Sequence, residues 1–151
     1  MILASAQPIV LDTNVCLDLF VFHDPRWAPL MDALERGELA AVTRADCRDE
    51  YRIVLHYPHL PLDDDSRALA AARFDSLIAV VAPASRPVRL PVCSDRDDQK
   101  FLELARDAGA AILVTKDKAL LKLNRKTTQA GMFRIMLPET WLKLQTAGAL
   151  E

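Results

Sequence analysis

Five short apolar runs recur along the chain, and segments with helical spacing separate them. Each run is a few residues long and rich in aliphatic or β-branched residues, which is typical of a buried strand. The predicted strands cover residues 8–11, 39–42, 80–82, 111–114 and 133–137. The predicted helices cover residues 15–22, 27–36, 44–57, 67–78, 120–123 and 138–146, and a further short helix ends at the turn at residues 107–109. Asp65 or Ser66 is expected to cap the helix at residues 67–78, and residues 124–131 are expected to form a basic, polar loop. Strands that alternate with helices predict an α/β fold with a parallel sheet covered on both faces.

Length and charge narrow the classes of protein that the chain can represent. The 151 residues are enough for a hydrophobic core, and no linker or repeat interrupts them, so a single domain over residues 1–151 is expected. A net charge of −2 excludes a global basic field, so any contact with nucleic acid must rest on a local patch. The three cysteines, Cys16, Cys47 and Cys93, are scattered, as is typical of reduced thiols. No apolar run reaches the roughly 18 residues of a membrane span, and a cytoplasmic location is expected.

Two aspartates lie where predicted strands end. Asp12 comes directly after the strand at residues 8–11, and Asp117 follows the strand at residues 111–114. In an open parallel sheet, ligands bind in the crevice beyond the carboxyl ends of the strands, so both side chains are candidates for a binding site. Alternatively, each aspartate serves only as the N-cap of the helix that follows it.

Two further acids lie on predicted helices. Glu50 falls on the apolar face of the helix at residues 44–57. Burying an unpaired carboxylate is costly, so we expect Glu50 in a metal site; the alternative is a salt bridge to a neighbouring arginine. Asp98 lies at a helix start, where capping and the helix dipole favour a carboxylate without any further role. A flanking stripe is expected to point to solvent, and it consists of Arg44, Arg48 and Arg52.

The four acids together predict a cation site. Two carboxylates about 4 Å apart repel each other by roughly 4 kcal/mol at an effective dielectric constant of 20. Four of them would not stay ionised side by side without cations, and Mg²⁺ or Mn²⁺ suits a ligand set made only of carboxylates. Other patterns are weaker, because His56 and His59 span Pro58 and are expected in a solvated loop. Basic residues beside Asp117 form either a solvated face or a rim that contacts phosphate.

The acidic motifs, in this order, resemble those of the PIN domain family. The resemblance rests on the strand that runs into Asp12, on Glu50 in a helix after the second strand, and on the segments at residues 93–105 and 113–121. It extends from residue 8 to about residue 144. The segment at residues 93–105 is similar to the branch formed by the toxins of toxin–antitoxin systems, the VapC-like ribonucleases.

This resemblance implies a three-layer α/β/α sandwich with a central, mostly parallel sheet, and a homodimer with an antitoxin protein as partner. The positions that it assigns to catalysis and metal binding are Asp12, Glu50, Asp98 and Asp117. The supporting positions are Thr13, Asn14, Asp95, Asp97 and Thr115. The expected RNA contacts are Arg48, Arg96, Lys116 and Lys118. Arg96 and Lys116 stand where the branch usually has proline and glycine, so they either bind phosphate or pair with the acids and blunt metal binding.

The implied activity is endoribonuclease cleavage with one or two Mg²⁺ or Mn²⁺ ions. A water of lowered pKa attacks a backbone phosphorus, and the expected products carry a 5′-phosphate and a 3′-hydroxyl. One alternative is a catalytically silent module on the same fold that binds RNA or protein, and metal titration separates the two. A second alternative is a phosphotransferase with Asp12 as nucleophile, as in haloacid-dehalogenase-like enzymes. Those enzymes place a second aspartate where Asn14 stands, which disfavours this reading.

Overall fold

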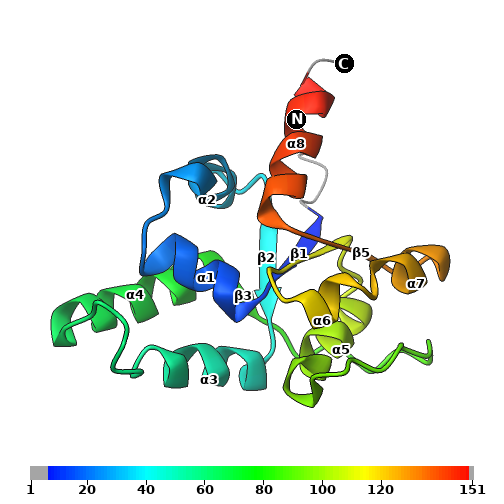
Figure 1. The fold of residues 1–151 in the computed structure, drawn as a ribbon, viewed down its shortest axis with the longest axis horizontal. Coiled ribbons are helices and arrows are strands. Elements are labelled where there is room, and N and C mark those ends of the chain that lie inside the picture. Colours follow the sequence, from blue (N-terminus) through cyan, green and yellow to red (C-terminus); the bar gives the residue numbers. More distant parts are fainter. Residues whose placement is uncertain (1–6, 150–151) are drawn as a thin grey trace.

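A five-stranded sheet forms the centre of the protein. The computed structural model describes residues 7–149, and its strand order is β3-β2-β1-β4-β5 (Figure 1). Every neighbouring pair of strands is parallel, which confirms the predicted parallel sheet. The strands are β1 (Pro8–Leu11), β2 (Ala40–Thr43), β3 (Ile78–Val80), β4 (Ile112–Val114) and β5 (Arg134–Met136).

Helices connect the strands and cover the sheet. The α-helices are α1 (Thr13–Phe20), α2 (Ala28–Glu35), α3 (Ala45–Val54), α4 (Asp64–Leu77), α5 (Gln99–Asp107), α6 (Lys118–Leu121), α7 (Asn124–Gln129) and α8 (Pro138–Ala149). Two short 3₁₀ helices precede α2 and α5, and they are η1 (Pro25–Trp27) and η2 (Arg96–Asp98). Over residues 7–149, no helix has the length and apolar character needed to span a membrane.

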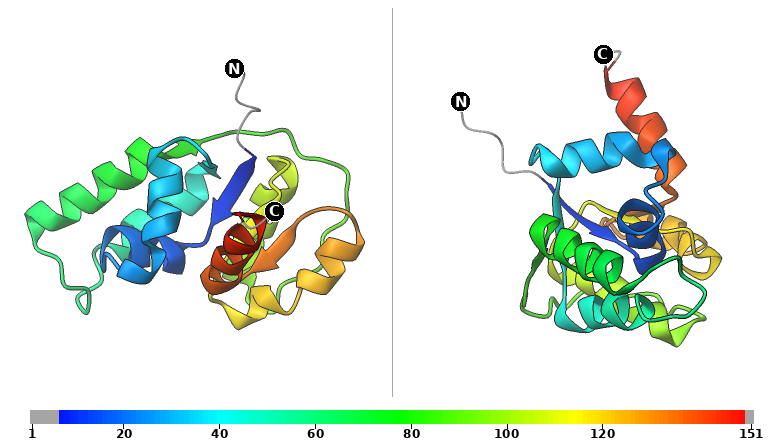
Figure 2. Two further views of the ribbon diagram at one scale, coloured as in Figure 1. Left: turned by 90° about the horizontal axis from the view of Figure 1, so that it is seen from above. Right: turned by 90° about the vertical axis from the view of Figure 1, so that its left-hand side faces the viewer.

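The core is divided between the two faces of the sheet. Along β1, Ile9 and Leu11 pack into one cluster and Val10 into the other, because successive side chains of a strand point to opposite faces. The first cluster contains side chains of α1, α2, α4 and α8, and the second contains those of α5 and α6. Helices therefore lie on both sides of the sheet (Figure 2), and the expected three-layer α/β/α sandwich is confirmed.

The carboxyl ends of the central strands form the edge where the acids gather. Leu11 pairs with Val114, and just beyond them the Asp12 amide donates to the Val114 carbonyl over 2.9 Å. The Thr115 amide donates to the Met136 carbonyl over 3.0 Å. These bonds continue the ladder past the ends of β1 and β4, so Asp12 and Thr115 become neighbours although they are distant in sequence.

Helix α3 is fixed against the core by its aromatic side. The Tyr51 ring stacks on Phe74 with 4.4 Å between centroids, and its hydroxyl donates to the Ala70 carbonyl of α4 over 3.0 Å. A stacked aromatic pair with a satisfied hydroxyl restricts rotation of the helix about its axis. The position of Glu50, one residue before Tyr51, follows from this anchoring.

Two local predictions were wrong. Residues 124–131 were expected to be a loop, but α7 forms there because the Asn124 side chain accepts from the Ile135 amide of β5 over 2.8 Å and Thr127 is fully buried. Asp65 or Ser66 was expected to cap α4, but Asp63 does so. Its carboxylate accepts from the Ser66 amide over 2.8 Å, and the Ser66 hydroxyl accepts from the Asp63 amide over 2.9 Å.

We expect Asp63→Ala to lower the free energy of unfolding by about 1 kcal/mol, because it removes the N-cap and half of the capping box. Chemical denaturation monitored by circular dichroism measures the change. The matched control is Asp65→Ala, which alters an exposed first-turn residue outside the box and is expected to cost less. Equal losses in the two variants would contradict the assignment of the cap.

Candidate functional site

Asp12 is held rigidly at the end of β1. It is 4% exposed, and it caps α1 by accepting from the Thr13 amide over 2.7 Å. Its second carboxylate oxygen accepts from the Thr115 hydroxyl over 2.6 Å. Burial raises the pKa of Asp12 to about 6, with the charges of Glu50 and Asp117 adding to the rise and the two hydrogen bonds opposing it. Asp12 is therefore an oriented carboxylate that ionises close to neutral pH.

Thr115 links the ends of β1 and β4. Its side chain is fully buried, and its hydroxyl oxygen accepts from the Asp117 amide over 3.0 Å while it donates to Asp12. Asp117 in turn caps α6 by accepting from the Ala119 amide over 2.8 Å. One buried hydroxyl thus sets the positions of both Asp12 and Asp117. Each of these aspartates caps the helix that follows it and also lies at the carboxyl edge of the sheet.

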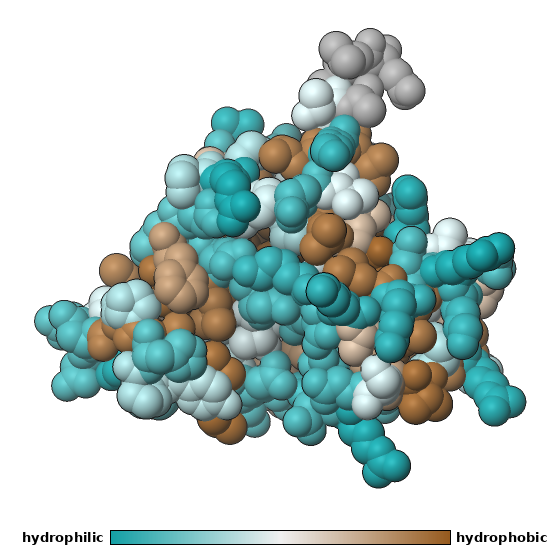
Figure 3. Space-filling model, viewed as in Figure 1, coloured by the Kyte–Doolittle hydropathy of each residue, from teal (hydrophilic) through white to brown (hydrophobic). Residues whose placement is uncertain are grey.

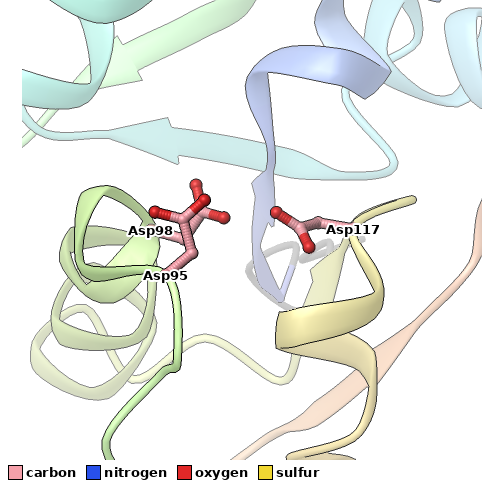
Figure 4. Close-up of side chains that lie close together, drawn as sticks. All are labelled: Asp95, Asp98 and Asp117. Carbon is pink, nitrogen blue, oxygen red and sulfur yellow. The ribbon is translucent and has the colours of Figure 1, made fainter.

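Three carboxylates converge where η2 faces the start of α6. Oxygens of Asp95, Asp98 and Asp117 lie within 4.8 Å of one another. Figure 4 shows the side chains of Asp95 and Asp98 on one side and that of Asp117 pointing toward them from the other. Asp95 is placed by the turn that it caps, since it accepts from the Asp97 amide over 3.1 Å. The first side of this group is therefore built by η2 and the second by the loop after β4.

Asp98 has the least favourable environment for a negative charge among these three carboxylates. It is 9% exposed, and among the described residues its Oδ2 atom has no hydrogen-bond donor. Burial, together with the neighbouring Asp117, Asp12 and Asp95, raises the pKa of Asp98 to about 8. Interaction with the neighbouring Asp98 carboxyl lowers the pKa of Asp117, so of the two groups Asp117 ionises first. A group that lacks a donor and repels its neighbours is suited to a cation.

Glu50 differs from expectation in its partner. Its carboxylate is 27% exposed rather than buried, and it pairs with the Lys100 ammonium over 2.7 Å rather than with an arginine of α3. The other carboxylate oxygen accepts from the Thr13 hydroxyl. Glu50 is therefore directed toward Asp12, but among the described residues the group of carboxylates within 4.8 Å of one another does not include either of them.

The arginine stripe of α3 is engaged rather than free. Arg44 pairs with Asp46 and with Glu103 of α5 over 2.8 and 2.9 Å, and Arg52 pairs with Asp75 of α4 over 2.8 Å. Arg52 is exposed, as expected of a stripe that faces solvent, although Asp75 pairs with it. Arg44 is half-buried, because α5 packs beside α3 and presents Glu103 to it. Arg48 is half-buried.

The remaining predicted supporting and RNA-binding residues are partly engaged in contacts and partly exposed. The Asn14 side chain accepts from the Lys116 amide over 3.3 Å and so supports the loop after β4, whereas Asp97 is exposed. Lys116 pairs with Asp18 of α1 over 2.8 Å, so it does not neutralise the predicted acids. The residues Arg96 and Lys118 are exposed beside the acids in sequence. Hydrophilic side chains gather over the middle of the face seen in Figure 3, with apolar patches to either side.

Sequence reasoning missed the contributions of Lys100 and Asp18. Lys100 lies in the first turn of α5, two residues after Asp98, and Asp18 interrupts the apolar run of α1. Asp18 is signalled by its charge within an apolar run, whereas Lys100 follows a run of polar and charged residues that gives no such signal. In both cases only the packing of α3 on α5, and of α1 on the loop after β4, identifies the partner.

Comparison with known families agrees with this arrangement. A family model described as PIN domain matches residues 8–119, which is more than half of the chain and includes all four predicted acids. The fold and the site are those of an α/β/α protein with acids at the carboxyl edge of a parallel sheet. Because the family model covers most of the chain, this chain belongs to the PIN domain family. Proteins of this family are generally nucleases that act on RNA and usually use divalent metals. A search of curated proteins finds no significant match.

Proposed function

We propose that this protein is a divalent-metal-dependent endoribonuclease that hydrolyses phosphodiester bonds of RNA. The observation that carries the proposal is the convergence of Asp95, Asp98 and Asp117 around a buried Asp98 oxygen that has no donor among residues 7–149. Carboxylates at this spacing need a cation to be ionised together, and their hard oxygen ligands suit Mg²⁺ or Mn²⁺. Membership of the PIN domain family supports the same conclusion.

Asp98 and Asp117 are the residues best placed to hold the ion, with Asp95 beside them and Asp12 on the adjoining strand end. A bound divalent cation supplies Lewis-acid chemistry, because it acidifies a water and neutralises negative charge on the phosphate. Asp98, whose pKa is raised to about 8, must lose its proton when both carboxylates become ligands. Metal binding by this protein is therefore expected to release protons.

The chain's own residues orient the reaction. Asp12 keeps one geometry because both of its oxygens accept hydrogen bonds, and with a pKa of about 6 it is mostly ionised at neutral pH. A carboxylate with this pKa is suited to accept a proton from an attacking water. The exposed side chains of Arg96 and Lys118 supply positive charge for phosphate contacts beside the acids. The expected products carry a 5′-phosphate and a 3′-hydroxyl.

We also propose the finer role of a toxin restrained by an antitoxin, acting in the cytoplasm as a homodimer of single-domain chains. The support is the similarity of residues 93–105 to the toxin branch of the family. A small open reading frame beside the gene, whose product binds this protein and blocks RNA cleavage, is the expected partner. An adjacent product that leaves cleavage unchanged would contradict the proposal.

Cleavage of single-stranded RNA by the purified protein is expected to require Mg²⁺ or Mn²⁺ and to stop in excess chelator. Asp12→Asn is expected to abolish cleavage while the protein stays folded, because the change removes a charge and keeps the shape. Asp32→Asn, an exposed site on α2, is the matched control and should cleave normally. Undiminished cleavage in chelator would refute the metal requirement, and RNA binding without cleavage in either metal would favour a silent binding module.

A further inference from the structure

Lys100 links α3, which carries Glu50, to η2, which carries Asp98. Its ammonium is 2.7 Å from Glu50 Oε1, and it also donates to the Asp97 carbonyl of η2. The two side chains are 19% and 27% exposed, so the pair is largely shielded from water. An ion pair that is partly desolvated is screened less than a surface pair and constrains its members more strongly.

The contact continues from Glu50 into the centre of the site. Glu50 Oε2 accepts from the Thr13 hydroxyl, and the Thr13 amide donates to Asp12, whose other oxygen accepts from Thr115. Both oxygens of Glu50 and both oxygens of Asp12 therefore have partners. Asp98 Oδ2 has no donor within the part of the chain that the structure describes. The polar network is complete on the Glu50 side and open on the Asp98 side.

We propose that Lys100 is a positioning residue of the nuclease site, which holds Glu50 against Thr13 and neutralises it. Lys100 serves as a resident cation for the Glu50 side, and the divalent cation is thereby confined to the side formed by Asp95, Asp98 and Asp117. This inference rests on the proposed function for the presence of a divalent cation. It assigns Glu50 to the orientation of Thr13 and Asp12 rather than to direct metal binding.

Loss of Lys100 is expected to change Mn²⁺ affinity and RNA cleavage in opposite directions. Removing the ammonium adds one net negative charge beside Asp12, so the metal-free protein should bind Mn²⁺ more tightly, by about 3- to 10-fold. The same change frees Glu50 and loosens Thr13 and Asp12, so RNA cleavage should fall by about 10- to 100-fold, the usual range for loss of an outer-shell partner. A lysine that only stabilises the fold would lower both quantities together.

The test compares Lys100→Met with wild type, using calorimetric titration of Mn²⁺ into the metal-free protein and cleavage of single-stranded RNA. Lys100→Arg keeps the charge and should restore Mn²⁺ affinity to within about threefold of wild type. Lys143→Met makes the same chemical change at an exposed site on α8 and should change neither readout. Lys100→Gln replaces the methionine variant if circular dichroism shows that the latter is unfolded.

A double-mutant cycle then asks whether Lys100 acts through Glu50. In the Glu50→Gln background, Lys100→Met should change cleavage by less than about twofold, because the side chain through which Lys100 acts has already lost its charge. Mn²⁺ affinity should still rise in that background, because the charge of the ammonium acts on the ion directly. An equal loss of cleavage in both backgrounds, or weaker Mn²⁺ binding by the single variant, would overturn the inference. If wild type itself binds no Mn²⁺, the proposed function fails, and that result is distinct from a failure of the Lys100 assignment.

Discussion

Asp98→Asn is expected to raise the melting temperature of the metal-free protein by roughly 5 °C at pH 8. The buried carboxylate sits beside Asp95 and Asp117, and its raised pKa means that its ionised form destabilises the folded state at that pH. Asparagine keeps the shape and removes the charge, and its amide can donate to Asp117. The stabilisation that Mn²⁺ confers on wild type should be lost in the same variant, because a ligand is removed.

The stability of metal-free wild type should also fall as pH rises. The pKa of Asp98 increases from its ordinary value of 3.8 to about 8 on folding, so between these values the folded state binds more protons than the unfolded state. Stability therefore decreases across this range and levels off above pH 8. Asp12, with a pKa of about 6, adds a smaller decrease of the same sign.

Melting curves at pH 5.5 and pH 8.5 in chelator test both statements. Asp98→Asn should flatten the difference between the two pH values, and the exposed control Asp32→Asn should leave it unchanged. A melting temperature for Asp98→Asn below that of wild type at pH 8.5 would show that the carboxylate is not repelled by its neighbours. It would also remove the main electrostatic support for a cation there.

Thr115→Val is expected to destabilise the protein by about 2–4 kcal/mol. The fully buried hydroxyl donates to Asp12 and accepts from the Asp117 amide, and valine leaves both groups without this partner. A lost hydrogen bond to a charged group and an unsatisfied buried partner each cost about 1–3 kcal/mol. Because Thr115 sets the geometry of two acids, cleavage should fall more than the loss of stability alone explains.

Urea denaturation at neutral pH measures this effect. Thr128→Val is the matched control, since its exposed hydroxyl donates only to the Asn124 side chain and its loss should cost below about 0.5 kcal/mol. Similar midpoints for the two variants would mean that the Thr115 hydroxyl does not hold the strand ends together.

Much of the fold followed from local pattern. The apolar runs marked every strand to within two residues at either end, because a short run buried on both faces of a parallel sheet has few alternatives. The loop expected at residues 124–131 failed for the opposite reason. Nothing in that polar segment has helical periodicity, and α7 depends on the Asn124 contact with β5 across the fold.

The positions of Asp12 and Asp117 after buried strands were determined by the sequence, because parallel strands bring their carboxyl ends to one edge. The sequence did not determine which acids share an ion. Asp95 joins Asp98 and Asp117 through the η2 turn, whereas Glu50 forms an ion pair with Lys100, which is 50 residues away in the sequence. Local periodicity sets the face on which a side chain lies, but the charge that neutralises it depends on how separate helices pack, and only the tertiary structure decides that.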